Sequence, residues 1–306
     1  MEYTIMHTLQ RTVAAPVTCS GVGLHSGKAV NLTIRPAPAN FGIKFIRTDL
    51  PDSPTISALF NMVVDTSLAT VIGANGCIVS TIEHLMAAFS GLGIDNALVE
   101  LDSYEVPVMD GSAGPFTHSI LEVGVVEQEA PRHFFVIKNP IELKSDGKYV
   151  GAFPADEFRI TCSIAFEHRR VGEQSFSLAV SDSAFEKEVS SARTFGFLEE
   201  VEYLKRFGLA QGGSLENAVV LDREEIINKE GLRFENEFVR HKLLDCIGDL
   251  SLLGMPIMGH IVVKKSGHAF NHEFLKRFLT DKDAWETTAF QTERFAVCSH
   301  PKSLAN

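Results

Sequence analysis

The spacing of apolar and polar residues predicts strands and helices in both halves of the chain. In the first half, apolar residues that alternate with polar ones indicate strands, whereas apolar residues that recur every three or four positions indicate helices. The predicted strands are 30–34, 43–46 and 97–101, and the predicted helices are 81–93, which ends on glycines, and about 114–123.

The second half begins again with strands and then turns to helices. Strands are predicted at 133–138, 148–153, 158–166, 176–180, 217–222 and 257–265. Helices are predicted at 182–189, 196–208, 236–253 and 272–280, with a loop at 266–271 before the last of them. Runs of strands followed by runs of helices, twice over, are typical of α+β structure. We therefore predict two similar α+β domains, each a sheet with helices packed on one face.

A polar segment that ends near a proline, at 126–132, has the composition of a linker between these domains. It places an N-terminal α+β domain at 1–128 and a C-terminal α+β domain at 132–283. The stretch 284–306 shows no clear period and is left unassigned.

Composition indicates a soluble protein of a reducing compartment. No apolar run reaches the ~18 residues of a membrane span, and the N-terminus lacks the basic-then-apolar order of a signal peptide. The five cysteines are scattered and form no CxxC pair, which argues against disulfides and against a cysteine-built metal site. We therefore expect a cytoplasmic protein.

The charge balance narrows the choice of partner. A net charge of −11, from 28 basic and 39 acidic residues, argues against nucleic acid as a ligand. An anionic small molecule remains compatible with this charge, because a local cluster of Lys and Arg can act against the overall sign.

The predicted helix 236–253 carries a polar stripe with metal-binding potential. At 100° per residue, His241, Asp245 and Asp249 fall within about 80° of one another, opposite the apolar side. An imidazole and a carboxylate four positions apart can reach one metal ion from a single helix. The alternative is a solvated face on which Lys242 pairs with one of the two aspartates. The helix taken alone favours that alternative.

Two further segments hold candidate catalytic groups. Glu83 and His84 open the predicted helix 81–93, where a base beside a metal ligand would suit hydrolysis. The alternative for Glu83 is a capping box with Ser80, and that for His84 is a half-buried helix histidine. His268, in the predicted loop after a strand, is either a surface residue or an acid for a leaving amine.

Several motifs occur together, in this order, in one known family. They are GVGLHSGK at 21–28, MVVDTSLATVI at 62–72, TIEHLMAA at 81–88, SARTFGF at 191–197, GLRFENEFVRHKLLDCIGDLSLLG at 231–254 and KSGHAFNH at 265–272. On these motifs the chain resembles the zinc-dependent UDP-3-O-acyl-N-acetylglucosamine deacetylases, which act in lipid A biosynthesis in Gram-negative bacteria. The resemblance runs from about residue 8 to at least residue 285.

The resemblance implies a metal-dependent amidohydrolase with its active site between the two domains. His84, His241 and Asp245 would be the ligands of one zinc ion, with ferrous iron as the alternative metal, and a fourth position would stay open for water. Glu83 would be the general base that activates this water for attack on the acetamide carbonyl. His268 would donate the proton to the departing glucosamine nitrogen.

Three more residues receive supporting roles from the same resemblance. Asp249 would keep His268 in its charged form. Lys242 would add a positive charge at the site, and the Thr194 hydroxyl would help to stabilise the developing oxyanion.

The resemblance also implies where an acylated UDP-aminosugar would bind. The residues that match an acyl-chain passage are Phe195, Phe197, Val201, Ser214 and Ala218. Each buried methylene contributes about 0.8 kcal/mol, so such a passage gives real affinity for a fatty chain. Lys148 matches a position that meets the UDP-sugar portion, and His25 is expected near the sugar.

Two other classes of protein compete with the enzyme. A non-catalytic acyl and UDP-sugar binding relative would have no need for Glu83 beside the metal. A structural zinc protein would close its site with four Cys or His ligands, whereas two His and one Asp leave a position open. The residues favour the enzyme, which we expect to be a monomer that acts on a small molecule.

Overall fold

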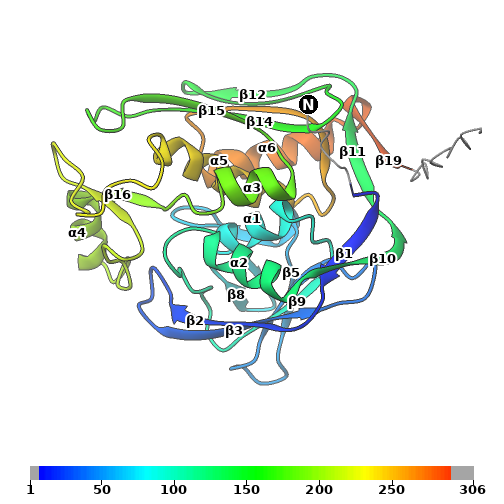
Figure 1. The fold of residues 1–306 in the computed structure, drawn as a ribbon, viewed down its shortest axis with the longest axis horizontal. Coiled ribbons are helices and arrows are strands. Elements are labelled where there is room, and N and C mark those ends of the chain that lie inside the picture. The colour runs from blue at the N-terminus through cyan, green and yellow to red at the C-terminus, as the bar shows by residue number, and fades with distance from the viewer. Residues whose placement is uncertain (1–6, 291–306) are drawn as a thin grey trace, which may run out of the picture.

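Two large sheets form the outer layers of the molecule, and helices lie between them (Figure 1). The computed structural model describes residues 7–290. Each sheet therefore carries helices on its inner face and leaves its other face outward. This arrangement confirms the predicted α+β class with helices packed on one face of each sheet.

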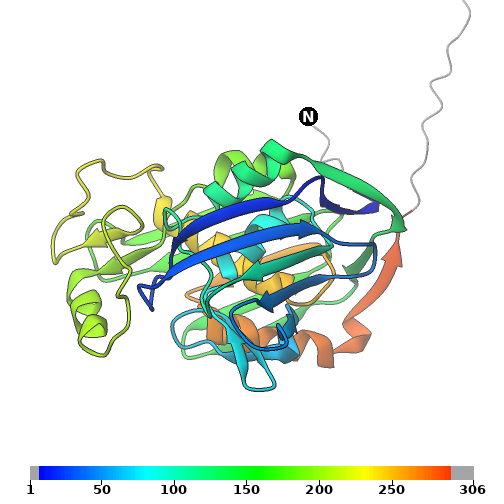
Figure 2. The ribbon, with the colours of Figure 1, turned by 90° about the horizontal axis from the view of Figure 1, so that it is seen from below.

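The first large sheet is built from the N-terminal half. Its strands run in the order β2 (Val17–Val22), β3 (Ala29–Pro36), β9 (Ala97–Leu101), β4 (Ile43–Arg47) and β5 (Thr55–Ser57). Alternate residues of β3, such as Val30 and Leu32, are buried because they face the helices, and Figure 2 shows the sheet from its outer side. The helices on the inner face are α1 (Glu83–Gly91) and α2 (Gly114–Val123). The predicted strands and helices of this half are confirmed.

The second large sheet belongs to the C-terminal half. Its main path is β12 (Ile141–Ser145), β13 (Lys148–Phe153), β18 (Ile257–Lys264), β11 (His133–Ile137) and β19 (Trp285–Ala289). In addition, β14 (Phe158–Ala165) pairs with β18 and with β15 (Glu173–Ala179). The helices of this half are α3 (Asp182–Glu188), α5 (Glu237–Ser251) and α6 (His268–Thr280). Of these, α5 packs across β14 and β15.

Small elements extend from the two layers. A two-stranded sheet joins β1 (Leu9–Val13) to β10 (Val125–Pro131), and a three-stranded sheet holds β6 (Val63–Asp65), β7 (Val71–Ala74) and β8 (Cys77–Val79). The short strands β16 (Phe195–Phe197) and β17 (Val219–Leu221) pair in parallel, with α4 (Leu198–Arg206) between them in sequence. Short 3-10 turns are η1 (Phe60–Met62) and η2 (Lys282–Ala284).

Two local predictions are wrong. The supposed linker 126–132 is mostly strand β10, because β1, more than 100 positions earlier, supplies the backbone partners that a polar sequence does not reveal. The supposed loop 266–271 is partly helix: α6 begins at His268, and the Asn271 amide donates to the Gly267 carbonyl at 2.9 Å.

The stretch without a clear period contains a strand within its described part, 284–290. Strand β19 covers 285–289 and pairs antiparallel with β11, so a distant strand again determines its conformation. The remainder of that stretch, 291–306, lies outside the described residues, as do residues 1–6. The division into domains at 1–128 and 132–283 stays a proposal.

A candidate metal and catalytic site

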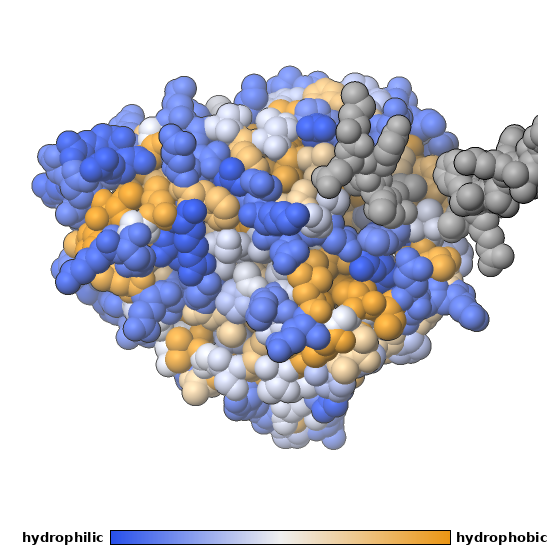
Figure 3. All heavy atoms as spheres, in the orientation of Figure 1, coloured by the Kyte–Doolittle hydropathy of each residue, from blue (hydrophilic) through white to orange (hydrophobic). Residues whose placement is uncertain are grey.

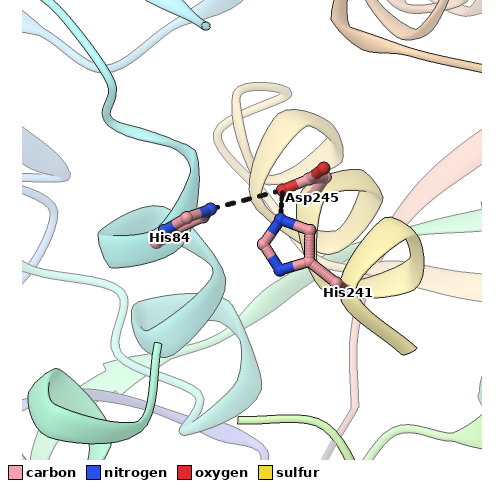
Figure 4. Close-up of side chains that lie close together, drawn as sticks. All are labelled: His84, His241 and Asp245. Atoms are coloured by element: carbon pink, nitrogen blue, oxygen red, sulfur yellow. Dashed lines mark ion pairs between the residues drawn. The ribbon is translucent and has the colours of Figure 1, made fainter. Parts of the chain in front are cut away.

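Helices α1 and α5 bring three buried metal-ligand candidates together. His84 is the second residue of α1, whereas His241 and Asp245 lie one turn apart on α5 (Figure 4). Asp245 Oδ1 lies 3.5 Å from His84 Nε2 and 3.3 Å from His241 Nε2. One ligand atom from each of the three residues lies within 4.8 Å of the others.

The protonation of this cluster suits a metal ion. His241 Nδ1 lies 3.0 Å from the Ala192 carbonyl oxygen. Because a carbonyl oxygen only accepts, Nδ1 must carry the proton of the ring, which leaves the lone pair on Nε2, the nitrogen nearest Asp245. Burial lowers the pKa of His241 to about 3, which keeps the imidazole neutral. Burial alone would raise the pKa of Asp245, but neighbouring basic groups, Lys242 among them, hold it well below its usual value. Two imidazoles and a carboxylate fit an open zinc site.

Glu83 is the first residue of α1 and points toward the same site. Its Oε2 accepts a hydrogen bond from the Thr70 amide at 3.1 Å, and its Oε1 lies 3.8 Å from His268 Nε2. Burial raises the pKa of Glu83 against the opposing effect of the nearby imidazoles. The capping-box interpretation is wrong, because Ile82 is the N-cap and no side chain caps this helix.

His268 is paired with Asp249. At the start of α6, its Nδ1 lies 2.9 Å from Asp249 Oδ2 on α5. Burial by itself would lower the pKa of His268, but Asp249 outweighs it and raises this pKa to about 10. The imidazole is therefore a cation at neutral pH, with Nε2 directed toward Glu83.

The polar stripe of α5 is buried, not solvated. Asp245 and Asp249 are 4% and 2% exposed, so the solvated-face alternative is wrong. The pairing that it proposed nevertheless exists, since Lys242 Nζ lies 2.8 Å from Asp245 Oδ2. Burial would lower the pKa of Lys242, but Asp245 more than offsets this and raises it. Lys242 also lies over the Phe195 ring, 5.6 Å from its centroid.

Thr194 and Phe195 connect the site to the strands β16 and β17. The Thr194 amide donates to the Gly111 carbonyl at 2.7 Å, and its carbonyl accepts from the Val219 amide at 2.8 Å. The Phe195 ring centroid lies 6.4 Å from that of His241 and 4.9 Å from that of Phe238. This contact places β16 beside the metal-ligand cluster.

The other acyl-passage candidates lie around β16, β17 and α4. Phe197 lies in β16, where its ring is 5.9 Å from that of Phe166, and Val201 lies in α4. Ala218 directly precedes β17, and Ser214 lies in the turn before it. Hydrophobic residues gather on the side of the molecule where α4 and β16 lie (Figure 3).

Lys148 and His25 lie on other elements. Lys148 is exposed at the start of β13, in a hollow that Lys144, Tyr149 and Lys264 also line. His25 lies in the turn between β2 and β3, where its amide donates to Glu105 Oε1 at 2.8 Å. Both ring nitrogens of His25 are buried without a hydrogen-bond partner among the described residues.

Some contacts of the site were missed by sequence reasoning. Thr70, Asn271 and the Ala192 carbonyl bond directly to candidate site residues. Thr70 lies within the motif MVVDTSLATVI at 62–72, but its partner Asp249 is 179 positions away. No local pattern indicates such a pair.

Comparison with known proteins identifies relatives along nearly the whole chain. The family described as UDP-3-O-acyl N-acetylglycosamine deacetylase (LpxC) matches residues 10–280. A UDP-3-O-acyl-N-acetylglucosamine deacetylase of Myxococcus xanthus is 53% identical over 90% of this chain and 88% of its own length. Proteins of the same name from Syntrophus aciditrophicus and Cellvibrio japonicus are 49% and 47% identical, over 92% and 97% of this chain and 89% and 98% of their own lengths. No helix within residues 7–290 is long and apolar enough to cross a membrane.

Proposed function

Because this chain belongs to the UDP-3-O-acyl-N-acetylglucosamine deacetylase family, we propose that His84, His241 and Asp245 hold the metal ion of its active site. The chain is an amidohydrolase. It converts UDP-3-O-acyl-N-acetylglucosamine to UDP-3-O-acyl-glucosamine and acetate in lipid A biosynthesis. The observation that carries the proposal is the clustering of the three ligand atoms within 4.8 Å beside Glu83. The metal is zinc, with ferrous iron as the alternative.

The metal, when bound, supplies a Lewis acid that polarises the acetamide carbonyl and acidifies a water molecule. Glu83 takes the proton of the attacking water. Its raised pKa supports this role, because a carboxylate with a higher pKa is a stronger base and accepts the proton of the water more readily. Its position one residue before His84 keeps the carboxylate beside the ligand cluster.

His268 supplies the proton for the leaving group. The bond between the acetyl carbon and the glucosamine nitrogen breaks, so this nitrogen must gain a proton to leave as an amine. The ion pair with Asp249 keeps His268 charged and turns Nε2 toward the reaction centre. The cation of Lys242 and the hydroxyl of Thr194 stabilise the negative charge that develops on the carbonyl oxygen.

The acyl chain and the UDP-sugar portion of the substrate bind on different elements. The acyl chain lies among Phe195, Phe197, Val201, Ser214 and Ala218, which surround β16, β17 and α4. The diphosphate meets the hollow at Lys148, whose lysines supply local positive charge on an acidic protein. Both ring nitrogens of His25, which have no hydrogen-bond partner within residues 7–290, are available to bind the sugar.

The setting of the enzyme is part of the proposal. We place it in the cytoplasm as a monomer with a small-molecule substrate and without nucleic acid. The scattered cysteines support a reducing compartment, and the net charge of −11 argues against nucleic acid.

Acetate release tests the proposal directly. UDP-3-O-acyl-N-acetylglucosamines of several chain lengths are supplied to the protein before and after chelation, and zinc or ferrous iron is then added back. We expect chelation to abolish acetate release and one metal to restore it. Turnover that survives full removal of metal would overturn the ligand assignment, and turnover independent of the acyl chain would overturn the passage.

A further inference from the structure

Thr70 lies between the candidate base and the candidate acid. It is 2% exposed and directly precedes β7, in a segment that passes the start of α1. All three of its polar groups are engaged: the amide donates to Glu83 Oε2, the carbonyl accepts from the Ile82 amide at 3.3 Å, and the hydroxyl contacts Asp249.

The hydroxyl bond fixes the rotation of the Asp249 carboxylate. Thr70 Oγ1 donates to Asp249 Oδ1 at 2.6 Å, and a bond this short to a charged acceptor is among the stronger hydrogen bonds in proteins. Asp249 Oδ2 is thereby left for His268 Nδ1 at 2.9 Å and for Asn271 Nδ2 at 2.8 Å. Each carboxylate oxygen has its own partners.

The hydrogen bond from the Thr70 backbone amide fixes the rotation of the Glu83 carboxylate in the same way. Because Oε2 accepts the Thr70 amide, the other oxygen, Oε1, is the one that lies toward His268 Nε2. Thr70 thus selects which oxygen of Glu83 and which oxygen of Asp249 faces the imidazole of His268. A single buried residue aligns the two carboxylates on either side of that ring.

We propose that Thr70 is a positioning residue that aligns Glu83 and the Asp249–His268 pair for proton transfer. The inference rests on the roles proposed above for Glu83 and His268. Thr70 does not act on the substrate itself. It holds Glu83, which accepts a proton from water, and His268, which donates one to the leaving nitrogen, in position. Small misplacements of such groups reduce turnover strongly.

The test compares Thr70→Val, which keeps the shape and loses the hydroxyl, with Thr70→Ser, which keeps the donor. We expect Thr70→Val to lower kcat about tenfold or more with little change in KM, since a hydrogen bond to a charged group is lost. Thr70→Ser should restore most of kcat. The matched control is Thr117→Val in α2, which removes another buried hydroxyl, one that donates to the carbonyl of Ala113 at the N-cap of that helix. Both valine variants should keep their metal.

A second readout is independent of turnover. The Nδ1–H proton of His268 is followed by NMR and assigned by its absence in His268→Gln. We expect Thr70→Val to shift this signal and Thr117→Val to leave it in place. If Thr70→Val does not fold, Thr70→Cys replaces it, because a thiol keeps a similar size and donates only weakly.

The outcomes separate this inference from the proposed function. An active wild type whose kcat and His268 signal are unchanged in Thr70→Val would overturn the role of Thr70 alone. A wild type that releases no acetate would overturn the function, and the NMR shift would still decide whether Thr70 aligns the pair.

Discussion

Gly248 of α5 lies against the backbone of Glu83 in α1. A Cβ added to Gly248 would lie 2.1 Å from the Glu83 carbonyl oxygen and 3.2 Å from the Ala87 amide nitrogen. Glycine is thus what allows the two helices to approach closely enough for His84 to meet His241 and Asp245. The metal-ligand cluster depends on a residue that has no side chain.

Gly248→Ala should therefore destabilise the protein and weaken the metal site. Helix propensity alone would stabilise this variant by about 1 kcal/mol, but a Cβ pressed against backbone atoms puts the overpacking cost at the upper end of the usual range, about 3 kcal/mol. We therefore expect the free energy of unfolding to fall by about 2 kcal/mol. Urea unfolding gives the free energy, and metal content after dialysis gives the affinity. An alanine variant as stable as the wild type, with full metal, would show that the helices need no such approach.

Glu83→Ala should retain the metal and lose activity. Removing a general base reduces turnover by about 10²–10⁴-fold, because the water must then lose its proton without help. Metal content and kcat are measured on the same samples. His84→Ala is the contrasting variant, since it should lose metal as well as activity. Near-normal turnover of metal-replete Glu83→Ala would falsify the assignment of the base.

The His268–Asp249 pair should make stability depend on pH between about 6.5 and 10. The pKa of His268 rises from its ordinary 6.5 to about 10 in the folded protein, so in this window the folded state binds a proton that the unfolded state lacks. The contribution of this pair is complete below pH 6.5 and is lost as the pH rises toward 10.

Urea unfolding of the metal-replete protein at several pH values in that window measures the effect. His268→Gln is the comparison, because it lacks the titrating ring. The free energy of unfolding of the wild type should fall more steeply with pH than that of the variant. Parallel slopes would mean that the ion pair does not hold the proton.

A larger side chain at Val201 should change the preference for acyl length. Val201 Cγ2 lies 3.2 Å from the position of a Cβ on Gly196 in β16, so the space between α4 and β16 is narrow. Val201→Phe should reduce kcat/KM for long acyl chains more than for short ones, by up to about fourfold for each methylene excluded.

The control for this prediction is Tyr203→Ala, because Tyr203 is on the same helix but is 61% exposed. It should leave the order of substrates unchanged. A chain-length profile that is the same in Val201→Phe and in the wild type would place the acyl chain elsewhere.

Local patterns predicted most regular elements, because each depends on residues near one another in sequence. The helices at 114–123 and 237–251 follow from apolar spacing, and the strand at 97–101 follows from its short, mostly apolar run. The polar residues of strand β10 resemble a linker, since they gain their partners only from β1. Ser266 and Gly267 are typical turn residues and favour a loop at His268, although Gly267 is the N-cap of α6.

In the candidate site, too, local features could be predicted from the sequence and long-range contacts could not. Spacing within one helix, which can be read from the sequence, sets His241 and Asp245 one turn apart, and the motifs indicate the family to which the chain belongs. Folding is what buries the polar stripe of this helix, brings His84 to it through the Gly248 contact, and joins Glu83 to Asp249 through Thr70. The reason is physical: spacing along a helix is a local property, whereas burial and long-range hydrogen bonds depend on segments that meet only when the chain has folded.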